Sequence, residues 1–355
     1  MFFKALLQAS LALPLLYTTA SAQTACNNSP SLCDKAYNNI THLGAHNSPF
    51  LRDSTTSFST SGNQYYNTRT QLESGVRLLS GQVHKKNNTS GNSAWHMCHS
   101  SCDLLDAGTL EEWLSEIKSW MDSNPNDVVT VLLVNSDNAS PAELGASFES
   151  TGLDKLAYSP PSLSQPPETW PTLQSLISNG TRLMTFVASL TPSAQYPYLM
   201  DEFTFIFEND FENETPTAYS CTPNRPSPLT TEQAATSGRM FFMNHFLYSV
   251  QLFGIQSPND TYIGTTNAQT GLGSLGEAIT SCTGVYSKPP TFVLVDFFNV
   301  GPAIGSVDTA NSVSNPTGRR SAPAEVLQET SGVSRQQGSM FAVVVAVVAA
   351  ISFGM

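Results

Sequence analysis

"TLEEWLSEIKSWMDSNPNDVVTVLLVN", residues 109–135, holds a helix pattern followed by a strand pattern. Thr109 is followed three residues later by Glu112, which is the arrangement of a capping box at the start of a helix. Apolar side chains then recur at the three- and four-residue spacing of one helix face, at Leu110, Trp113, Leu114, Ile117 and Trp120. The run 128–134 is almost continuously apolar, as in a strand that is buried on both faces. The sequence therefore predicts a helix over 109–121 and a buried strand over 128–134.

Similar apolar, β-rich runs recur along the chain and make eight candidate strands in all. Their ranges are 40–43, 76–83, 94–98, 128–134, 182–187, 203–207, 240–244 and 291–295. Strands that alternate with helices indicate a parallel sheet, and eight of them in one domain favour a closed barrel. The crossover between residues 187 and 203 contains "TPSAQYPYL", which leaves little room for a helix. We therefore predict an α/β fold, a distorted TIM-type (β/α)8 barrel.

Both ends of the chain have the composition of processing signals. Residues 1–22 combine an early lysine, an apolar run and a closing Ala-Ser-Ala, which is the plan of a secretory signal peptide. Residues 332–355 end in an apolar run after small and polar residues, which is typical of a GPI-attachment signal that is removed. Ser331 or Gly332 is then the attachment residue, and the alternative is a tail that stays in the membrane. We assign residues 23–305 to the barrel domain and the polar segment 306–331 to a flexible stalk.

The composition favours an exported protein and argues against nucleic acid as a partner. The formal net charge is -12 and the pI is near 4.8, and a protein this acidic repels a phosphate backbone. Six cysteines form an even set, so disulfides are expected in an oxidising compartment. The two close spacings suggest the pairs Cys26 with Cys33 and Cys98 with Cys102, which leaves Cys221 with Cys282. Eight sequons are candidates for N-glycosylation, at Asn27, Asn39, Asn87, Asn88, Asn138, Asn179, Asn213 and Asn259.

Polar residues at the ends of the predicted strands form the candidate site, because β/α-barrel enzymes place their chemistry at the carboxyl ends of the strands. These residues are His46, Asn47, Gln82, His84, His99, Asn135, Glu208, His245 and Asp296. Two histidines and an aspartate make an acid–base set. One imidazole removes a proton from the nucleophile, the other protonates the leaving group, and the carboxylate orients the first. The eighth strand neighbours the first in a closed barrel, so Asp296 is expected near His46.

Four ordered motifs carry a resemblance to a known family. They are "THLGAHNS" (41–48), "GVRLLSGQVH" (75–84), the segment 95–135 that ends in the opening stretch, and "TFVLVDFFNVG" (291–301). Together they resemble the X-region of phosphatidylinositol-specific phospholipase C, and especially the fungal secreted PLC-like phosphodiesterases. The similarity runs from about Asn39 to Val300. It implies a distorted β/α barrel, in agreement with the count of strands.

The resemblance also implies a reaction and a role for each catalytic candidate. His46 matches the general base of the family, His99 the general acid, and Asp296 the carboxylate that supports the base. In that family a hydroxyl of the substrate's own sugar ring attacks the phosphodiester, which gives a cyclic phosphate and releases diacylglycerol. The implied substrate is a phosphoinositide or a glycosylphosphoinositol-type diester at the outer membrane leaflet. The remaining strand-end residues, Asn47, Gln82, His84, Asn135, Glu208 and His245, are expected to bind it.

The chain departs from the family at the cation that offsets the charge of the phosphoryl group. Bacterial members place an arginine where this chain has Gln82, and mammalian members bind calcium at the positions of Asn47, Ser80, Gln82 and Asn135. A calcium site usually includes carboxylates, and these four positions have none. We therefore expect no calcium cofactor. Lys85, Lys86, His84 or a protonated His245 is a candidate replacement.

Alternative interpretations of the same residues remain. His96, Cys98, His99 and Cys102 could form a zinc cluster, although oxidation of the cysteines and the alternation of His96 and His99 disfavour it. Arg77 within an apolar strand is expected to be a structural ion-pair partner. Four tyrosines form either a stacking or membrane-touching rim or ordinary loop packing: Tyr65, Tyr66, Tyr196 and Tyr198. The alternative function is a catalytically inactive, GPI-anchored cell-wall or adhesion protein on the same barrel.

Overall fold

The structure is a computed structural model that describes residues 25–87, 93–250 and 256–328. The predicted signal peptide, the predicted GPI-attachment signal and the sequon at Asn88 lie outside the described residues. None of the described helices combines the length and the apolar composition of a membrane span.

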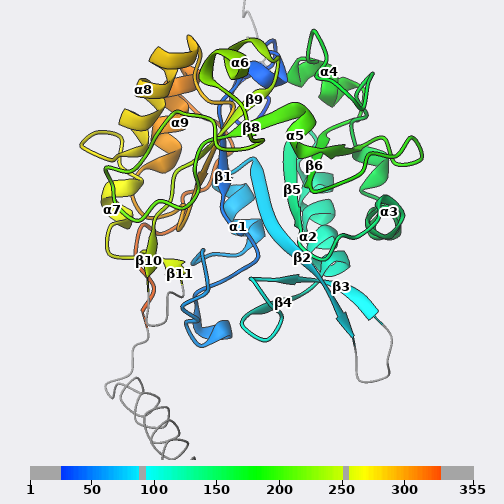
Figure 1. Ribbon diagram of the computed structural model, residues 1–355, viewed down its shortest axis with the longest axis horizontal. Coiled ribbons are helices and arrows are strands. Elements are labelled where there is room, and N and C mark those ends of the chain that lie inside the picture. The colour runs from blue at the N-terminus through cyan, green and yellow to red at the C-terminus, as the bar shows by residue number, and fades with distance from the viewer. Residues whose placement is uncertain (1–24, 88–92, 251–255, 329–355) are drawn as a thin grey trace, which may run out of the picture.

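Eight parallel strands form one curled sheet (Figure 1). They are β1 (His42–Ala45), β2 (Leu78–Asn87), β5 (Val129–Asn135), β6 (Leu183–Ala188), β7 (Leu199–Asp201), β8 (Ile206–Glu208), β9 (Met240–Asn244) and β12 (Phe292–Val295). Their order in space is β7-β6-β5-β2-β1-β12-β9-β8, and each strand pairs in parallel with its neighbours in this order. β7 and β8 end the series, so the barrel is open between them. The predicted α/β fold, a distorted TIM-type barrel, is confirmed.

The barrel is open close to the segment 187–203, in which the sequence leaves little room for a crossover helix. β7 leads directly into α5 (Glu202–Phe205), a single turn that continues into β8. The strand predicted over 203–207 is therefore divided between α5 and β8, and the sequence pattern missed β7. Without a full crossover helix, the chain cannot bring these two strands together as parallel neighbours.

The strand predicted over 94–98 exists, but it does not belong to the barrel. It is β3 (Ser93–Cys98), which pairs antiparallel with β2, and β4 (Asp106–Thr109) pairs antiparallel with β3. Parallel neighbours need a crossover of about a dozen residues or more, and the chain between β2 and β3 is shorter than that. A separate two-stranded sheet joins β10 (Tyr248–Val250) to β11 (Gln256–Pro258).

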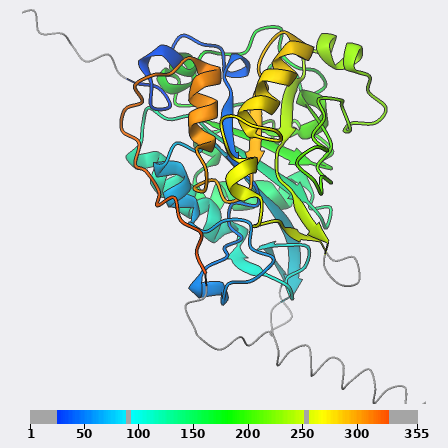
Figure 2. The same ribbon diagram turned by 90° about the vertical axis from the view of Figure 1, so that its left-hand side faces the viewer.

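Helices cover the outside of the curled sheet, and α8 and α9 lie side by side in Figure 2. The α-helices besides α5 are α1 (Thr68–Glu73), α2 (Leu110–Ser123), α3 (Pro141–Thr151), α4 (Leu173–Ser178), α6 (Thr231–Thr236), α7 (Ile263–Thr266), α8 (Leu275–Tyr286) and α9 (Ala303–Asn311). Short 3-10 helices span Pro30–Leu32, Tyr37–Asn39, Ser54–Thr56 and Asp154–Leu156. α2 is the predicted helix, and Thr109 and Glu112 form its capping box.

Side-chain alternation divides the core into two parts. On the outside of the sheet, Val131 and Leu133 pack in one cluster with the apolar face of α2. On the inside, Leu132 packs in a second cluster with aromatic residues such as Phe242. Successive residues of a strand point to opposite faces, so parity along each strand decides which side chains enter the barrel. Gly44 of β1 lets the two strands pack closely here, because a Cβ would lie 2.6 Å from Leu78 Cδ2 and that side chain would have to move.

The C-terminal boundary of the domain differs from the one predicted at residue 305. Residues 303–311 form α9, in which Val307 is buried. The Asn311 side chain accepts a hydrogen bond from Thr41 N and donates one to Thr41 O, beside β1. Farther along, Arg319 forms an ion pair with Asp308. The predicted start of the stalk therefore lies inside a helix of the domain, whose small residues gave a weak apolar signal.

Three disulfides join the pairs that the spacings suggested, Cys26–Cys33, Cys98–Cys102 and Cys221–Cys282. Arg77 is a structural residue, as predicted. Its Nη2 lies 2.7 Å from Asp127 Oδ1 and its guanidinium lies over the Trp120 ring.

Candidate active site

His46 and Asp296 meet because they follow adjacent parallel strands. Ala45 of β1 is in register with Val295 of β12, so the next residue of each strand lies beside the other. His46 Nδ1 is 2.9 Å from Asp296 Oδ1, and the two side chains are 12% and 7% exposed. The carboxylate therefore holds Nδ1, and it leaves Nε2 as the nitrogen that can exchange a proton with a substrate. The ring of Phe246 stacks on the imidazole at 3.9 Å.

Asn63 is a fully buried residue of this site that the sequence analysis missed. Its Nδ2 donates a hydrogen bond to the same Asp296 oxygen at 2.9 Å. Its Oδ1 accepts a hydrogen bond of 3.3 Å from Asn47 Nδ2. Asn63 lies in the loop after β1, outside any strand, so no strand-end rule selects it. Its side chain fixes the carboxylate that orients His46.

His99 reaches the same end of the barrel from the β3–β4 hairpin. The Cys98–Cys102 disulfide closes its loop, and His99 N donates to Leu105 O at 2.9 Å. Its Nδ1 forms a short hydrogen bond with Ser61 O, and its ring stacks on Phe50. Thus the loop after β1 orients both histidines, through Ser61 and Asn63. Burial lowers the pKa of His99 below its usual value of 6.5, and the hydrogen bond to Ser61 O offsets this only in part.

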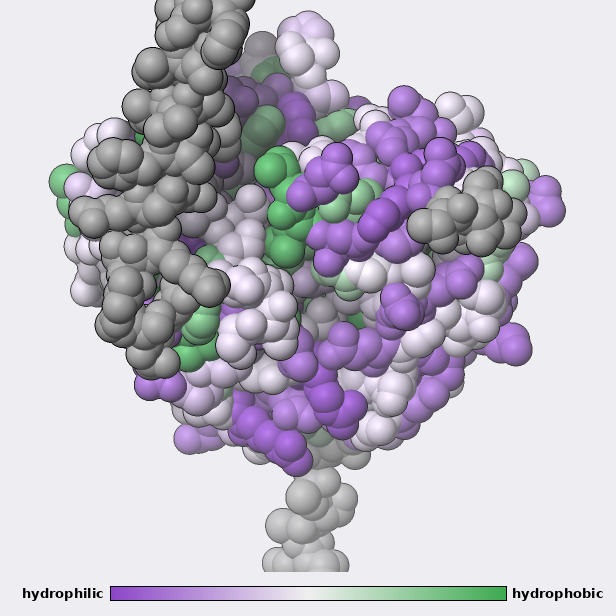
Figure 3. Space-filling model, turned by 90° about the horizontal axis from the view of Figure 1, so that it is seen from below, coloured by the Kyte–Doolittle hydropathy of each residue, from purple (hydrophilic) through white to green (hydrophobic). Residues whose placement is uncertain are grey.

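A cavity of about 280 Å³ opens beside His46 at the carboxyl ends of the strands. Residues of one parity line it along each strand, such as Leu132 and Val134 of β5 and Asn244 and Phe246 at β9. Of the predicted substrate-binding residues, Asn47, Gln82 and Glu208 line it. The β3–β4 hairpin and the β10–β11 sheet lie in the lower part of Figure 1, and Figure 3 views the molecule from below, where hydrophilic residues lie beside a smaller apolar group.

The other predicted substrate-binding residues lie elsewhere. Asn135 has the opposite parity to Val134, and its amide group bonds to both backbone groups of Ala139. His84 lies beyond the barrel rim, in the part of β2 that pairs with β3, and its Nδ1 is 3.3 Å from Asp137. Asn135 and His84 were predicted to bind the substrate, but neither lines the cavity, because their strands direct these side chains elsewhere.

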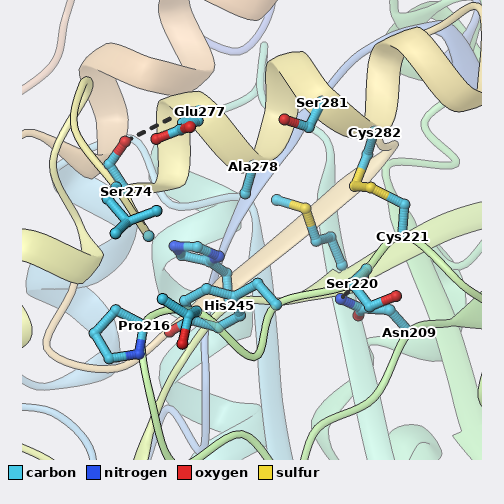
Figure 4. A pocket seen from close by; sticks show the side chains of 15 residues that line it. Asn209, Pro216, Ser220, Cys221, His245, Ser274, Glu277, Ala278, Ser281 and Cys282 are labelled. Atoms are coloured by element: carbon cyan, nitrogen blue, oxygen red, sulfur yellow. Dashed lines mark hydrogen bonds between the residues drawn. A yellow bond between two sulfur atoms is a disulfide. The ribbon is translucent and has the colours of Figure 1, made fainter.

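His245 lines a second pocket of about 180 Å³ between the loop after β8 and α8 (Figure 4). It has the opposite parity to Asn244, so it points away from the cavity beside His46. The side chain is fully buried, its Nε2 is 2.9 Å from Thr266 O, and its ring stacks on Tyr219. Burial lowers its pKa to about 4. His245 is therefore neutral near pH 7 and is not the cation that the sequence analysis considered.

The residues at the expected calcium positions do not fit that ion. Ser80 Oγ accepts a hydrogen bond from Asn47 N, and Gln82 Oε1 accepts one from Ser100 N. Asn135 Oδ1 accepts one from Ala139 N. None of these side chains carries a charge, and their oxygens already accept hydrogen bonds from backbone N–H groups. Calcium binding would break these hydrogen bonds, and the four positions offer the ion no carboxylate ligand.

Two further alternatives are decided by local contacts. The disulfide between Cys98 and Cys102 leaves no thiolate for the zinc cluster, and His96 Nδ1 contacts Asp106 instead. Among the four tyrosines, three are buried and belong to the packing rather than to an exposed rim: Tyr65, Tyr196 and Tyr198.

Two of the predicted glycosylation sites are buried in the fold. Asn27 is 7% exposed, and its Oδ1 accepts a hydrogen bond from Val128 N at 2.7 Å. Asn213 is 3% exposed, and its Nδ2 donates to Asp210 O at 2.9 Å. A glycan is attached through Nδ2, so neither site has room for one in this structure. The other described sequons are more exposed and stay predictions: Asn39, Asn87, Asn138, Asn179 and Asn259.

We therefore expect Asn27 and Asn213 to be unmodified in the secreted protein. Enzymatic glycan release in heavy-oxygen water, followed by peptide mapping, marks each formerly occupied asparagine. The more exposed sequons serve as internal controls. A marked Asn27 or Asn213 in folded protein would contradict the placement of that segment.

Comparisons with known proteins bear on this arrangement. The PI-PLC X family model (PI-PLC X 1) matches residues 32–311. An uncharacterized secreted protein of Arthroderma benhamiae is 38% identical over 285 residues, which are 79% of this chain and 62% of that protein. The PI-PLC X domain-containing protein 1 of the same fungus is 36% identical over 289 residues, 81% of this chain and 90% of that protein. The chain thus spans less than two thirds of the first of these relatives.

Solved structures share the fold at low sequence identity. The phosphatidylinositol-specific phospholipase C of Listeria monocytogenes gives a TM-score of 0.52 at 13% identity, over 80% of this chain and 97% of that one. A mutant of the corresponding Staphylococcus aureus enzyme gives a TM-score of 0.53 at 13% identity, over 82% and 98% of the two chains.

Proposed function

The chain belongs to the PI-PLC X family, and from that premise we propose that it cleaves a phosphodiester of the phosphoinositide or glycosylphosphoinositol type with a pair of histidines. One observation carries the proposal. His46, held by Asp296 and Asn63, opens onto a cavity of mixed polar and apolar lining at the carboxyl ends of the barrel strands. A buried carboxylate that fixes one imidazole nitrogen is the arrangement that prepares the other nitrogen for proton transfer.

In the proposed reaction a ring hydroxyl of the substrate attacks its own phosphorus atom. An O–P bond forms while Nε2 of His46 accepts the hydroxyl proton, and Asp296 stabilises the resulting imidazolium. The bond between phosphorus and the leaving oxygen breaks, and this oxygen takes a proton from His99. The products are a cyclic phosphodiester and a neutral alcohol, which is diacylglycerol when the substrate is a phosphoinositide. Gln82 and Glu208 line the cavity that would receive the head group.

We also propose that the protein works outside the cell. The signal-peptide pattern, three disulfides and the resemblance to a secreted fungal protein support this location. The composition of residues 332–355 supports a GPI anchor in the outer leaflet.

An inactive cell-wall or adhesion protein is the second candidate function. The observation in its favour is that Ser80 and Gln82 stand where relatives have cation-binding groups. Turnover of phosphatidylinositol vesicles by the protein purified from a secreting eukaryotic host separates the two candidates. We expect release of water-soluble phosphate from vesicles that contain phosphatidylinositol and none from pure phosphatidylcholine. No turnover of phosphatidylinositol or of a GPI-anchored reporter protein would favour the inactive protein.

Removal of calcium should leave the activity unchanged. The four expected ligand positions have no carboxylate, and three of their oxygens accept backbone hydrogen bonds. Turnover measured with excess EGTA is therefore expected to equal turnover with added calcium. Loss of activity in EGTA and its return with calcium would place a metal site among residues that we assign to hydrogen bonding.

The rate should be bell-shaped against pH, with a limb set by each histidine. The base must be neutral and the acid protonated. The pKa of His99 is lowered, so its protonated fraction is lost as the pH rises through a value below the usual 6.5. We expect turnover to decline already on the acidic side of neutrality. A rate that keeps rising above neutral pH would show that His99 is not the proton donor.

A further inference from the structure

The cavity beside His46 contains one positively charged group that the sequence analysis did not consider. Among the described residues that line it, Arg225 is the sole lysine or arginine. It comes from the loop between β8 and α6, and its side chain is 39% exposed. Its guanidinium carbon lies 4.4 Å from the centre of the Phe211 ring. A loop thus supplies the cavity with a cation, whereas the lysines of β2 do not line it.

The loop and the ion pair hold Arg225 in a defined position. Glu208 N donates to Arg225 O at 2.8 Å, and Asn224 N donates to Glu208 O at 2.7 Å, so the loop is bonded to the end of β8. Arg225 Nε donates to Glu208 Oε2 at 2.9 Å, and Nη2 donates to the same oxygen. Among the described residues, no hydrogen-bond acceptor is found for Nη1. The guanidinium is therefore fixed on one edge and has a donor to offer on the other.

The charges around Arg225 leave it as a usable cation. Glu208 is its direct partner, and Glu208 also accepts a hydrogen bond of 3.3 Å from Asn244. Glu202 lies in the same cavity, and burial together with the charge of Glu208 raises its pKa well above the usual range. This shift favours the neutral form of Glu202. Among the described residues, Glu208 alone forms an ion pair with the guanidinium, so an anion bound in the cavity would give Arg225 a second partner.

Lys85 and Lys86, the two lysines considered as the cation, form ion pairs with other residues. Lys85 Nζ lies 3.2 Å from Glu143, and Lys86 Nζ lies 2.6 Å from Asp106. Both lysines are on the part of β2 that pairs with β3, beyond the barrel rim. Neither lines the cavity beside His46.

We propose that Arg225 is a catalytic residue that contacts the non-bridging oxygens of the substrate phosphodiester and offsets the charge that develops on them. This inference rests on the proposed function. Arg225 takes no part in proton transfer, since the hydroxyl proton passes to His46 and the leaving oxygen is protonated by His99. Its role is electrostatic, and a guanidinium suits it because its planar donors match phosphate oxygens. The cation is thereby supplied from the loop after β8 rather than from the second strand.

Turnover of phosphatidylinositol vesicles is the first test. Arg225→Gln should lower kcat by about 10² to 10³, the effect of losing one donor to a developing negative charge. Arg320→Gln is the matched control, because Arg320 is 78% exposed and pairs with Glu73 at a separate pocket. It should retain the parent rate. An Arg225→Gln protein with parental kcat would overturn the inference.

Binding of inorganic phosphate is the second test, and it does not depend on activity. Calorimetric titration should give at least about tenfold weaker binding to Arg225→Gln than to the parent or to Arg320→Gln, as expected when a charged partner is removed. If the parent turns over no diester but Arg225→Gln still binds phosphate at least about tenfold more weakly than the parent, the proposed function fails while the contact between Arg225 and phosphate stands. Equal phosphate affinity in all three proteins would overturn the assignment.

Arg225→Lys guards against a folding defect, because it keeps a charge beside Glu208. Circular dichroism and thermal melts check each variant. Should Arg225→Gln fail to fold, Arg225→Lys decides alone, and its kcat and phosphate affinity are both expected below those of the parent. Parental values for both would overturn the inference.

Discussion

Replacement of His46 by alanine should lower turnover about 10² to 10⁴-fold, which is the range for loss of a general base. No other histidine can take over this role, because among the described residues no other imidazole bonds to Asp296. The thermal midpoint should change little, because Asn63 still donates a hydrogen bond to the Asp296 carboxylate when the imidazole is removed. Initial rates on phosphatidylinositol vesicles and a melting curve are the two measurements.

His84→Ala is a matched control for this substitution. It also removes a histidine that pairs with an aspartate, Asp137, yet His84 lies beyond the barrel rim, on the part of β2 that pairs with β3. It should keep the parental rate. A His46→Ala protein with normal turnover would reduce the segment around His46 to a structural loop.

The His46→Ala/His99→Ala double variant tests whether the two histidines act as a unit. Residues that share one step lose less together than the product of their single effects. The double variant should therefore be only slightly slower than the slower single variant. Multiplicative losses would mean that the two side chains contribute to different steps.

Asp296→Asn should have an effect of similar size, about 10² to 10⁴-fold on kcat, because it removes the negative charge that orients His46 and stabilises its cation. Oδ1 of Asp296 accepts hydrogen bonds from both His46 Nδ1 and Asn63 Nδ2. An amide cannot provide an equally strong acceptor there, so the imidazole is free to adopt the wrong tautomer. The KM should change little, since Asp296 does not line the substrate cavity.

Asp137→Asn is the control, because it alters a second aspartate–histidine pair, with His84, that lies outside the cavity. Rates and melting curves of Asp296→Asn, Asp137→Asn and the parent should be compared at one pH. Equal rates for Asp296→Asn and the parent would show that His46 needs no carboxylate, which would remove the observation on which the proposed function rests.

Parity along the strands explains which site residues the sequence could predict. The rule that strand ends carry the chemistry selected Asn135 and His245 as well as Glu208. Val134 and Asn244 show that the neighbouring positions enter the cavity instead. A strand reverses its side chains at every residue, so an error of one position exchanges the inside for the outside. The run "NHFLY" (244–248) contains enough alternation to assign Phe246 and Tyr248 to the cavity once Asn244 is placed there.

The residues that come from loops could not be predicted in this way. Asn63 reaches Asp296 from the long connection after β1, and Arg225 enters from the loop after β8. No periodicity constrains such segments, and their paths are set by hydrogen bonds that form only in the folded chain. The barrel itself was predictable because buried parallel strands have near-continuous apolar runs. The β3 hairpin was misassigned because an apolar run does not reveal the direction of its partner.

The central claim is that a ring hydroxyl of the substrate attacks its own phosphorus atom under control of His46 and His99. Phosphorus NMR of phosphatidylinositol micelles incubated with the purified protein tests this claim most directly, because the cyclic phosphodiester has its own resonance. The account predicts that this resonance grows as that of the lipid falls, and that neither change occurs with His46→Ala. Unchanged lipid with the parent protein, or a lipid loss that never passes through the cyclic product, would contradict the account.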